Sequence, residues 1–526
     1  MEGSYSEGKD LIADLDTFLA SHEAELIEFR RDLHANPETG YAEHRTTRRV
    51  ALRLAAAGLK PVILPKGTGL LVDIGTNYSE RSVVALRADL DALPMADEKD
   101  VPYASTVPGV CHACGHDVHT TILLGTGLFL AQQAAAGLLP GRVRLIFQPA
   151  EERATGALDV LAAGGIASVG RIFALHCDPR LDAGQLGVRT GPITAACDKI
   201  EVRVTGPGGH TARPHLTADL VYALGKIVTE LPAALSRRVD PRSSLSLVWG
   251  QISAGNAPNA IPDTGLVTGT LRCLDDEAWH SAPVLLKELI DSVVGAYGVT
   301  AELVYDRFVP PTVNDTDCAA MLTTAGEAVL GHGGVVHTPQ SLGGEDFAWY
   351  LESIPGALAR LGTRSPGSAQ ENDLHQPTFD IDERAIGVGL RVMAATALTA
   401  LWEETSLAAS PADQSGSGSE SAYPAPAPAS AQYAAAYDPA AAYSPAPAYD
   451  PPAPFNPAPS FGPGSSLESA SSFNATPPFD PASTFDPAQA YDPAQAAFNS
   501  AAYGSATTYD SAAAYQPSTQ FPTRHS

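Results

Sequence analysis

The sequence predicts a two-domain α/β protein followed by a disordered tail. Over residues 11–194, helix patterns alternate with strand-like runs, which is typical of a sheet covered by helices. Residues 198–306 follow a different order, β-α-β-β-α-β, which is the split βαβ or ferredoxin-like motif. After residue 406 the hydrophobic periodicity stops and proline accumulates.

Hydrophobic spacing places the elements of the first part. Apolar positions recur at helical spacing over 11–33, 43–57 and 118–136. Branched apolar runs predict strands over 70–75, 82–88, 142–147 and 171–176. Helix and strand patterns with the composition of a sheet core resume from about 315 to 403. The ferredoxin-like segment is therefore expected to be an insertion into a larger domain.

The inserted segment has strand patterns at 198–206, 244–253, 264–273 and 299–306, with helices at 217–235 and 276–296. A boundary near residues 191–195 and the Pro310-Pro311 pair are the expected hinges. We therefore expect a catalytic domain built from residues 1–194 and 312–404, an inserted domain over 195–311, and a tail over 405–526.

The tail repeats an aromatic-Asp-Pro-Ala unit, as at Tyr437, Phe485 and Tyr491. It holds 20 of the 43 prolines, with 9 acidic residues and 1 basic residue. Proline at this density removes backbone donors, and few branched apolar residues remain to form a core. A disordered, solubilising spacer is the favoured interpretation, while the spaced aromatics leave weak self-association or docking of a partner open.

Composition limits the partners and the compartment. The chain has 33 basic and 59 acidic residues, a formal charge of −26, which argues against nucleic acid and anionic membranes as partners. The first residues show neither a basic region nor an apolar run typical of a secretory signal. Six cysteines in a body of this size are no disulfide framework. A cytoplasmic location is expected.

The segment CHACGHDVH over 111–119 is the densest cluster of metal-binding residue types. Cys114 and His116 flank a glycine, so a turning backbone can direct both at one point. Thiolate and imidazole are good ligands for borderline metals such as Zn²⁺. A closed structural site would require further paired cysteines, which the sequence lacks. The ligand types therefore favour a catalytic metal over a structural one.

Two strand ends add further ligands. FQPAEE ends a predicted buried strand with Glu151 and Glu152, and FALHCD ends another with His176. Open α/β sheets place ligands at the carboxyl ends of their strands. An isolated glutamate pair is usually solvated, and an isolated histidine is usually a satisfied core residue. Several such ends in one sheet together favour a metal site with one carboxylate left as a proton carrier.

A set of motifs occurs in order along residues 86–383: LRADLDALPM, HACGHDVHT, FQPAEE, ALHCD, GPGGHTARPH, NAIPD, GTLR, GGEDF and LHQPTFDIDE. In this order they resemble the M20 metallopeptidase superfamily, specifically its amidohydrolase branch of hippurate, N-acyl-amino-acid and auxin-conjugate hydrolases. The resemblance covers about residues 15–403. It implies a zinc-peptidase-like catalytic domain with an inserted ferredoxin-like domain that serves as lid and dimerisation unit.

The resemblance also implies two divalent metal ions per subunit. Cys114 stands where related peptidases use an aspartate that bridges both ions. His116 and His176 would complete the site of one ion, and Glu152 and His375 that of the other. Mn²⁺ or Zn²⁺ is expected, and Co²⁺ or Ni²⁺ stays open.

The implied catalytic roles fall on three other residues. Glu151 matches the general base, which takes a proton from water and returns it to the departing amine. Asp91 matches the residue that orients the metal site. His210, which the residue pattern alone would make a solvated loop histidine, matches one that stabilises the oxyanion in the partner subunit's site.

Substrate contacts are implied for Asn259 and Arg272. An arginine fork suits an amino-acid carboxylate, although a surface charge on a strand is a serious alternative for Arg272. Glu345 and Asp346 are expected to support the His375 side of the site structurally.

The predicted function is a metal-dependent amidohydrolase that converts N-acyl-amino acids to a carboxylate and a free amino acid, acting as a homodimer on a small molecule. One alternative is a dipeptidase, carboxypeptidase or aminobenzoyl-glutamate hydrolase of the same superfamily. A remoter alternative is a catalytically idle metal-binding scaffold whose tail carries the function.

Overall fold

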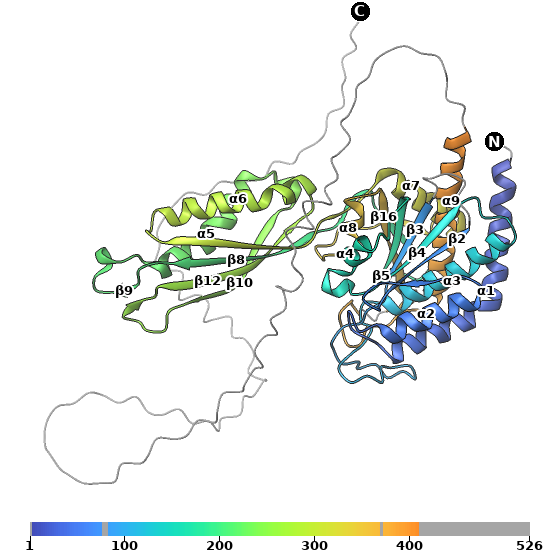
Figure 1. The fold of residues 1–526 in the computed structure, drawn as a ribbon, viewed down its shortest axis with the longest axis horizontal. Helices are drawn as coiled ribbons and strands as arrows, with labels where there is room; N and C mark the ends of the chain where they lie inside the picture. The colour runs from blue at the N-terminus through green and yellow to red at the C-terminus, as the bar shows by residue number, and fades with distance from the viewer. Residues whose placement is uncertain (1–2, 76–82, 369–371, 410–526) are drawn as a thin grey trace, which may run out of the picture. The chain divides into compact units, whose positions relative to one another are not determined.

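The computed structural model describes residues 3–75, 83–368 and 372–409 (Figure 1). The predicted strands and helices are present, most with shifts of one to three residues at their ends. The first helix, predicted over 11–33, begins at Gly3, and the strand predicted over 171–176 continues to Asp182. Most of the predicted disordered tail lies outside the described residues, which include only its first five residues, 405–409. Helix α9, Arg384–Ala409, continues past the expected boundary at residue 404, so this part of the tail is helical.

The larger sheet has the order β1-β2-β4-β3-β5-β16-β6-β15. Strands β3, β4, β5 and β16 at its centre run parallel, whereas β2 is antiparallel to β4. The carboxyl ends of parallel strands meet at one edge, where an open α/β sheet binds ligands. The eight strands are β1 Val62–Ile63, β2 Leu70–Gly75, β3 Val83–Asp89, β4 Arg142–Gln148, β5 Val169–Asp182, β6 Leu186–Val188, β15 Val335–His337 and β16 Gly356–Arg364.

Helices cover both faces of this sheet because the central strands are apolar on both sides. Alternate residues of β5 and β16 belong to two separate hydrophobic clusters, one containing Leu175 and Ala359 and the other Ala174 and Leu358. The first face packs against α1 Gly3–Ala35, α3 His116–Ala135, α7 Thr316–Leu330 and α9. The second packs against the short helices α4 Gly156–Ala162 and α8 Ala348–Leu351. Helix α2 His44–Ala56 contacts α3 and β1.

Helix α9 is long and apolar enough to span a membrane, with a mean hydropathy of 1.5 over Arg384–Glu403. However, 78% of this window is buried inside the protein. Its apolar composition is therefore explained by packing against α3, α7 and the sheet.

The inserted segment forms its own sheet, in the order β10-β12-β8-β13, with all neighbours antiparallel. Helices α5 Leu220–Arg238 and α6 Asp276–Gly295 lie along one face of it (Figure 1) and enclose a separate apolar core around Trp279. This is the predicted βαββαβ order. Its strands are β8 Ala196–Thr205, β10 Ser246–Ala254, β12 Thr264–Cys273 and β13 Thr300–Val309. Two short antiparallel pairs lie outside both sheets. One pairs β9 Gly209–His210 with β11 Ala260–Ile261, and the other pairs β7 Gly191–Thr194 with β14 Thr312–Asn314.

Candidate metal centre and active site

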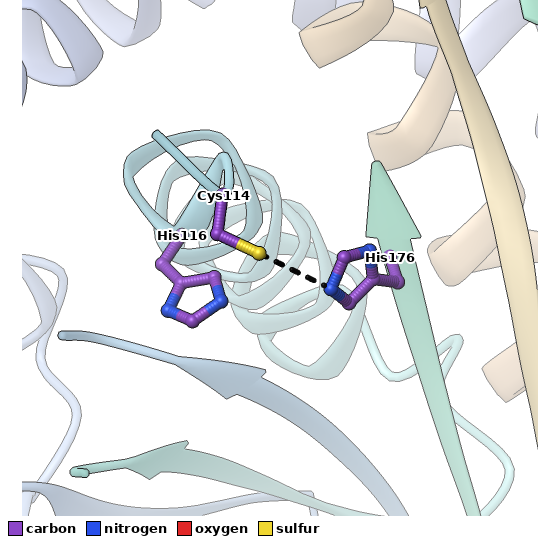
Figure 2. Close-up of side chains that lie close together, drawn as sticks. All are labelled: Cys114, His116 and His176. Atoms are coloured by element: carbon purple, nitrogen blue, oxygen red, sulfur yellow. Dashed lines mark hydrogen bonds between the residues drawn. The ribbon is translucent and has the colours of Figure 1, made fainter. Parts of the chain in front are cut away.

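Cys114, His116 and His176 converge at the carboxyl edge of the larger sheet. Figure 2 shows the Cys114 sulfur directed at the ring of His176, with His116 beside them. The distance from Cys114 Sγ to His176 Nε2 is 3.6 Å. Gly115, at φ +86°, turns the chain between the first two residues and precedes α3, and a Cβ there would lie 2.7 Å from the Cys177 sulfur. A glycine is therefore required for Cys114 and His116 to point the same way.

Backbone carbonyls fix the tautomers of both histidines. His116 Nδ1 lies 2.9 Å from the carbonyl oxygen of Asp91, and His176 Nδ1 lies 2.9 Å from that of Cys177. A carbonyl oxygen only accepts, so each Nδ1 must donate a proton. In the neutral imidazole each Nε2 therefore carries the lone pair, which is the arrangement that orients metal-binding histidines.

Glu152 and His375 form the second part of the cluster. Glu152 Oε1 lies 3.3 Å from His375 Nε2 and 4.0 Å from His116 Nε2. Cys114, Glu152 and His375 offer ligand atoms within 4.8 Å of one another, as do Cys114, His116 and His176. Cys114 is thus common to both groups, as expected of a shared ligand.

Two buried atoms show that this cluster fits a cation. His116 Nε2 and Glu152 Oε1 are buried and have no hydrogen-bond partner within the described residues. Buried polar atoms are normally paired, and an imidazole lone pair beside a carboxylate oxygen needs a proton or a metal ion between them. With a thiol among imidazole and carboxylate groups, this donor set suits divalent metal ions.

Glu151 lies beside the cluster without being one of its central ligands. Its Oε2 is 4.0 Å from His116 Nε2. Burial, together with the carboxylates of Glu345 and Glu152, raises the pKa of Glu151 well above its usual range. A raised pKa makes a carboxylate a stronger base than a solvated one, which suits Glu151 to accept a proton and release it again.

The loop that carries Glu151 and Glu152 is held by two carboxylates. Asp91 accepts hydrogen bonds from both backbone N–H groups, at 3.0 Å and 3.1 Å. Glu43 accepts one from Ala150 N at 2.7 Å, and Ala150 has a left-handed φ of +52°. Asp91 therefore contacts the backbone of Glu151 and Glu152 and, through its carbonyl, the ring of His116, while its orienting role stays a prediction.

Arg87 and Asp89 lie within the LRADLDALPM motif but had no predicted role, and Glu43 lies outside every motif. Asp89 accepts a hydrogen bond from His119 Nδ1 at 2.6 Å and pairs with Arg87 at 2.7 Å. His119 Nε2 accepts the Cys177 N–H at 2.8 Å, so its lone pair is occupied and His119 is no ligand. The sequence signal was an arginine and an aspartate inside a strand of otherwise apolar residues.

Glu345 and Asp346 do not support His375, contrary to expectation. Both pair with Arg87 Nη2, at 3.1 Å and 2.8 Å, and Asp346 also accepts bonds from Gln148. They brace β3 and β4, and Glu345 acts on the cluster only through its charge near Glu151. His375 instead has a backbone N–H bond to Ala113 O at 2.8 Å and a left-handed φ of +60°.

The three site residues predicted in the inserted segment lie apart from this cluster in the described chain. His210 and Asn259 are exposed on the β9–β11 pair, and no hydrogen bond or ion pair among the described residues joins them to the metal ligands. Arg272 on β12 donates to the carbonyl of Leu342. Their roles stay predictions, and those of His210 and Asn259 require a partner subunit or a movement of the inserted segment.

The comparisons with known proteins agree with this geometry. Residues 85–399 match the model of peptidase family M20/M25/M40. A putative glutamate–cysteine ligase 2-3 from Rhodococcus jostii is 49% identical over 73% of this chain, but the match spans only 47% of that longer relative. The N-acetylcysteine deacetylase of Bacillus subtilis is 37% identical over 72% of this chain and 97% of the relative.

One similar solved structure is of a protein that binds two metal ions. A Bacillus subtilis protein described as a dinuclear metal-binding peptidase of the M20 family is 35% identical, with a TM-score of 0.64 over 73% of this chain and 99% of that one. The fold, the ligand cluster and the family match thus agree. The chain belongs to peptidase family M20/M25/M40, and its described body is that of a metal-dependent amide-bond hydrolase.

Proposed function

We propose that this protein hydrolyses N-acyl-amino acids to a carboxylic acid and a free amino acid. The observation that carries the proposal is the position of Glu151, half-buried beside a five-residue ligand cluster, where it can transfer a proton. The Bacillus subtilis relative is an N-acetylcysteine deacetylase, which supports this substrate class.

The metal ligands, Glu151 and Asp91 have different roles in the proposed hydrolysis. Divalent ions held by Cys114, His116, His176, Glu152 and His375 would supply Lewis-acid activation of water and of the amide carbonyl. Glu151 takes one proton from the attacking water and delivers it to the amide nitrogen, so the C–N bond breaks and a neutral amine departs. Asp91 keeps Glu151 in place through the backbone N–H bond.

The proposal also covers the bound metal, the oligomeric state and the cellular location of the protein. Mn²⁺ or Zn²⁺ is the proposed metal, since the site combines one thiol with imidazole and carboxylate groups. We propose a homodimer in which His210 serves the partner subunit's site, because His210 contacts no ligand of its own chain among the described residues. A cytoplasmic location is supported by the six cysteines, all of which are unpaired thiols.

The test is free-amine release from N-acetyl, N-benzoyl and indoleacetyl amino acids, with dipeptides and aminobenzoyl-glutamate as competing classes. Protein loaded with Mn²⁺ or Zn²⁺ is expected to turn over the N-acyl-amino acids, and a chelator is expected to stop it. Faster turnover of dipeptides or aminobenzoyl-glutamate would favour the peptidase alternative. No turnover of any substrate, with metal bound, would favour the scaffold alternative.

A further inference from the structure

Two buried arginines of the larger domain are fully compensated by carboxylates. Arg30 and Arg87 are each 1% exposed. Each guanidinium lies within 3.5 Å of three carboxylates: Asp117, Asp380 and Glu383 for Arg30, and Asp89, Glu345 and Asp346 for Arg87. This is what burial of a positive charge normally requires.

Arg360 on β16 is buried without such compensation. It is 7% exposed, its Nε is buried without a hydrogen-bond partner, and its side chain forms no ion pair or hydrogen bond with any described residue. A buried, unpaired guanidinium is costly unless an external anion binds to it.

The nearest negative charges are already committed to other partners. Asp178 accepts both Nε and Nη2 of Arg180, at 2.9 Å and 2.7 Å. Glu345 lies 3.1 Å from Arg87 and accepts the Phe347 N–H. Both act on Arg360 through space only.

Arg360 lies next to the metal cluster. It is the direct partner of His176 in the parallel pairing of β16 with β5. Partners in adjacent strands project from the same face of a sheet, so the two side chains are neighbours. The Arg360 charge also acts on Cys114, the shared ligand. An anion bound to the Arg360 guanidinium would therefore lie next to the metal cluster, where the amide bond of a substrate must lie.

We propose that Arg360 binds the α-carboxylate of the N-acyl-amino acid. This inference rests on the proposed function. In such a substrate the carboxylate is separated from the amide nitrogen by one carbon atom, so a carbonyl held at the cluster brings the carboxylate close to the neighbouring guanidinium. The planar fork of arginine binds a carboxylate through two hydrogen bonds. Arg272, which already donates to the Leu342 carbonyl, becomes a secondary contact.

The test compares an acid with its neutral analogue. Acetate release is measured from N-acetyl-L-methionine and from N-acetyl-L-methioninamide, using full-length protein loaded with Zn²⁺. In Arg360→Met, kcat/KM for the acid is expected to fall about 100-fold, mainly through KM, and that for the amide by less than about 3-fold. Arg364→Met is the matched control, because Arg364 is on the same strand but pairs with Asp182 at 2.7 Å. The control should change neither value.

A binding measurement separates this inference from the proposed function. Calorimetric titration of N-acetyl-L-methionine and of benzoate into the metal-loaded protein measures carboxylate binding without turnover. Weaker binding of both in Arg360→Met, with unchanged metal content, supports the assignment even if no N-acyl-amino acid is cleaved, a result that would defeat only the proposed function. Equal losses for acid and amide, unchanged binding of both carboxylates, or loss of metal from the variant would each overturn it.

Discussion

The carboxylate of Asp91 accepts the backbone N–H of Glu151 at 3.0 Å, and its second oxygen accepts the next N–H along the chain at 3.1 Å. One side chain thereby holds the backbone of both Glu151 and Glu152. The same residue's carbonyl oxygen fixes the tautomer of His116. The geometry of the site therefore depends on a residue that needs to touch neither metal nor substrate.

Asp91→Ala is expected to weaken metal binding about 10–100-fold, because residues that orient ligands contribute on this scale. Competition with a chromophoric chelator measures the affinity. Asp240→Asn, which removes an exposed carboxylate paired only with Arg242, is the control. Unchanged metal affinity and kcat in folded Asp91→Ala would show that the two N–H bonds do not position the site.

Glu43 gives a prediction about stability and pH. Burial, with the nearby Asp91, raises its pKa to about 7 from an ordinary 4.5. The folded state therefore holds a proton that the unfolded state has lost between these pH values, so this group makes stability fall as pH rises from 4.5 to 7. This difference in pKa between the folded and unfolded states corresponds to at most about 3 kcal/mol in the free energy of unfolding.

Glu43→Gln keeps an acceptor for the Ala150 N–H but removes the titration. Its thermal midpoint is expected to match that of the wild type near pH 4.5 and to exceed it increasingly toward pH 7.5. Melting curves across this range measure the effect. A difference between the two proteins that stays constant with pH would contradict a raised pKa at Glu43.

The sequence was sufficient to predict the fold class because periodicity and strand composition are local signals. The strands over 70–75 and 264–273 have the predicted bounds. The resemblance also selected Cys114, His116 and His176, which the structure brings together. The expected start of the disordered tail at residue 405 was too early, since α9 continues to Ala409.

Contacts between distant residues were beyond sequence reasoning. Glu43 and Ala150 are 107 positions apart, and nothing in either neighbourhood indicates their hydrogen bond. Glu345 was assigned to the wrong side of the site because its partner Arg87 is far away in the chain. Arg360 is one arginine among many in the sequence, and only its burial without a partner distinguishes it.

The thiol of Cys114 is expected to influence metal choice. Cys114→Asp retains an anionic ligand that can be shared but replaces sulfur with oxygen, so the ratio of Zn²⁺ to Mn²⁺ affinity should fall at least about 10-fold. Chelator competition with each metal gives the ratio. Cys111→Ser, which changes a buried thiol outside the ligand cluster, should leave it unchanged. An unaltered ratio in Cys114→Asp would exclude Cys114 as a ligand.

The proposed role of His210 in the partner subunit predicts complementation. Glu151→Gln and His210→Ala chains are each expected to be nearly inactive. Co-expressed with different tags, mixed dimers carry one site with both native groups, so about a quarter of wild-type activity should return in a random mixture of isologous dimers. No recovery in purified mixed dimers would place His210 in the site of its own chain or outside both.

The most direct test of the central claim is the turnover of metal-loaded Glu151→Gln. Glutamine cannot carry the proton, so kcat is expected to fall about 10²–10⁴-fold. Metal content should stay at the wild-type level, because Glu151 is not one of the five proposed ligands. Glu28→Gln, a change at an exposed position, is the matched control. A metal-loaded Glu151→Gln protein that works at the wild-type rate would contradict the account of this site as an amidohydrolase centre with Glu151 as its base.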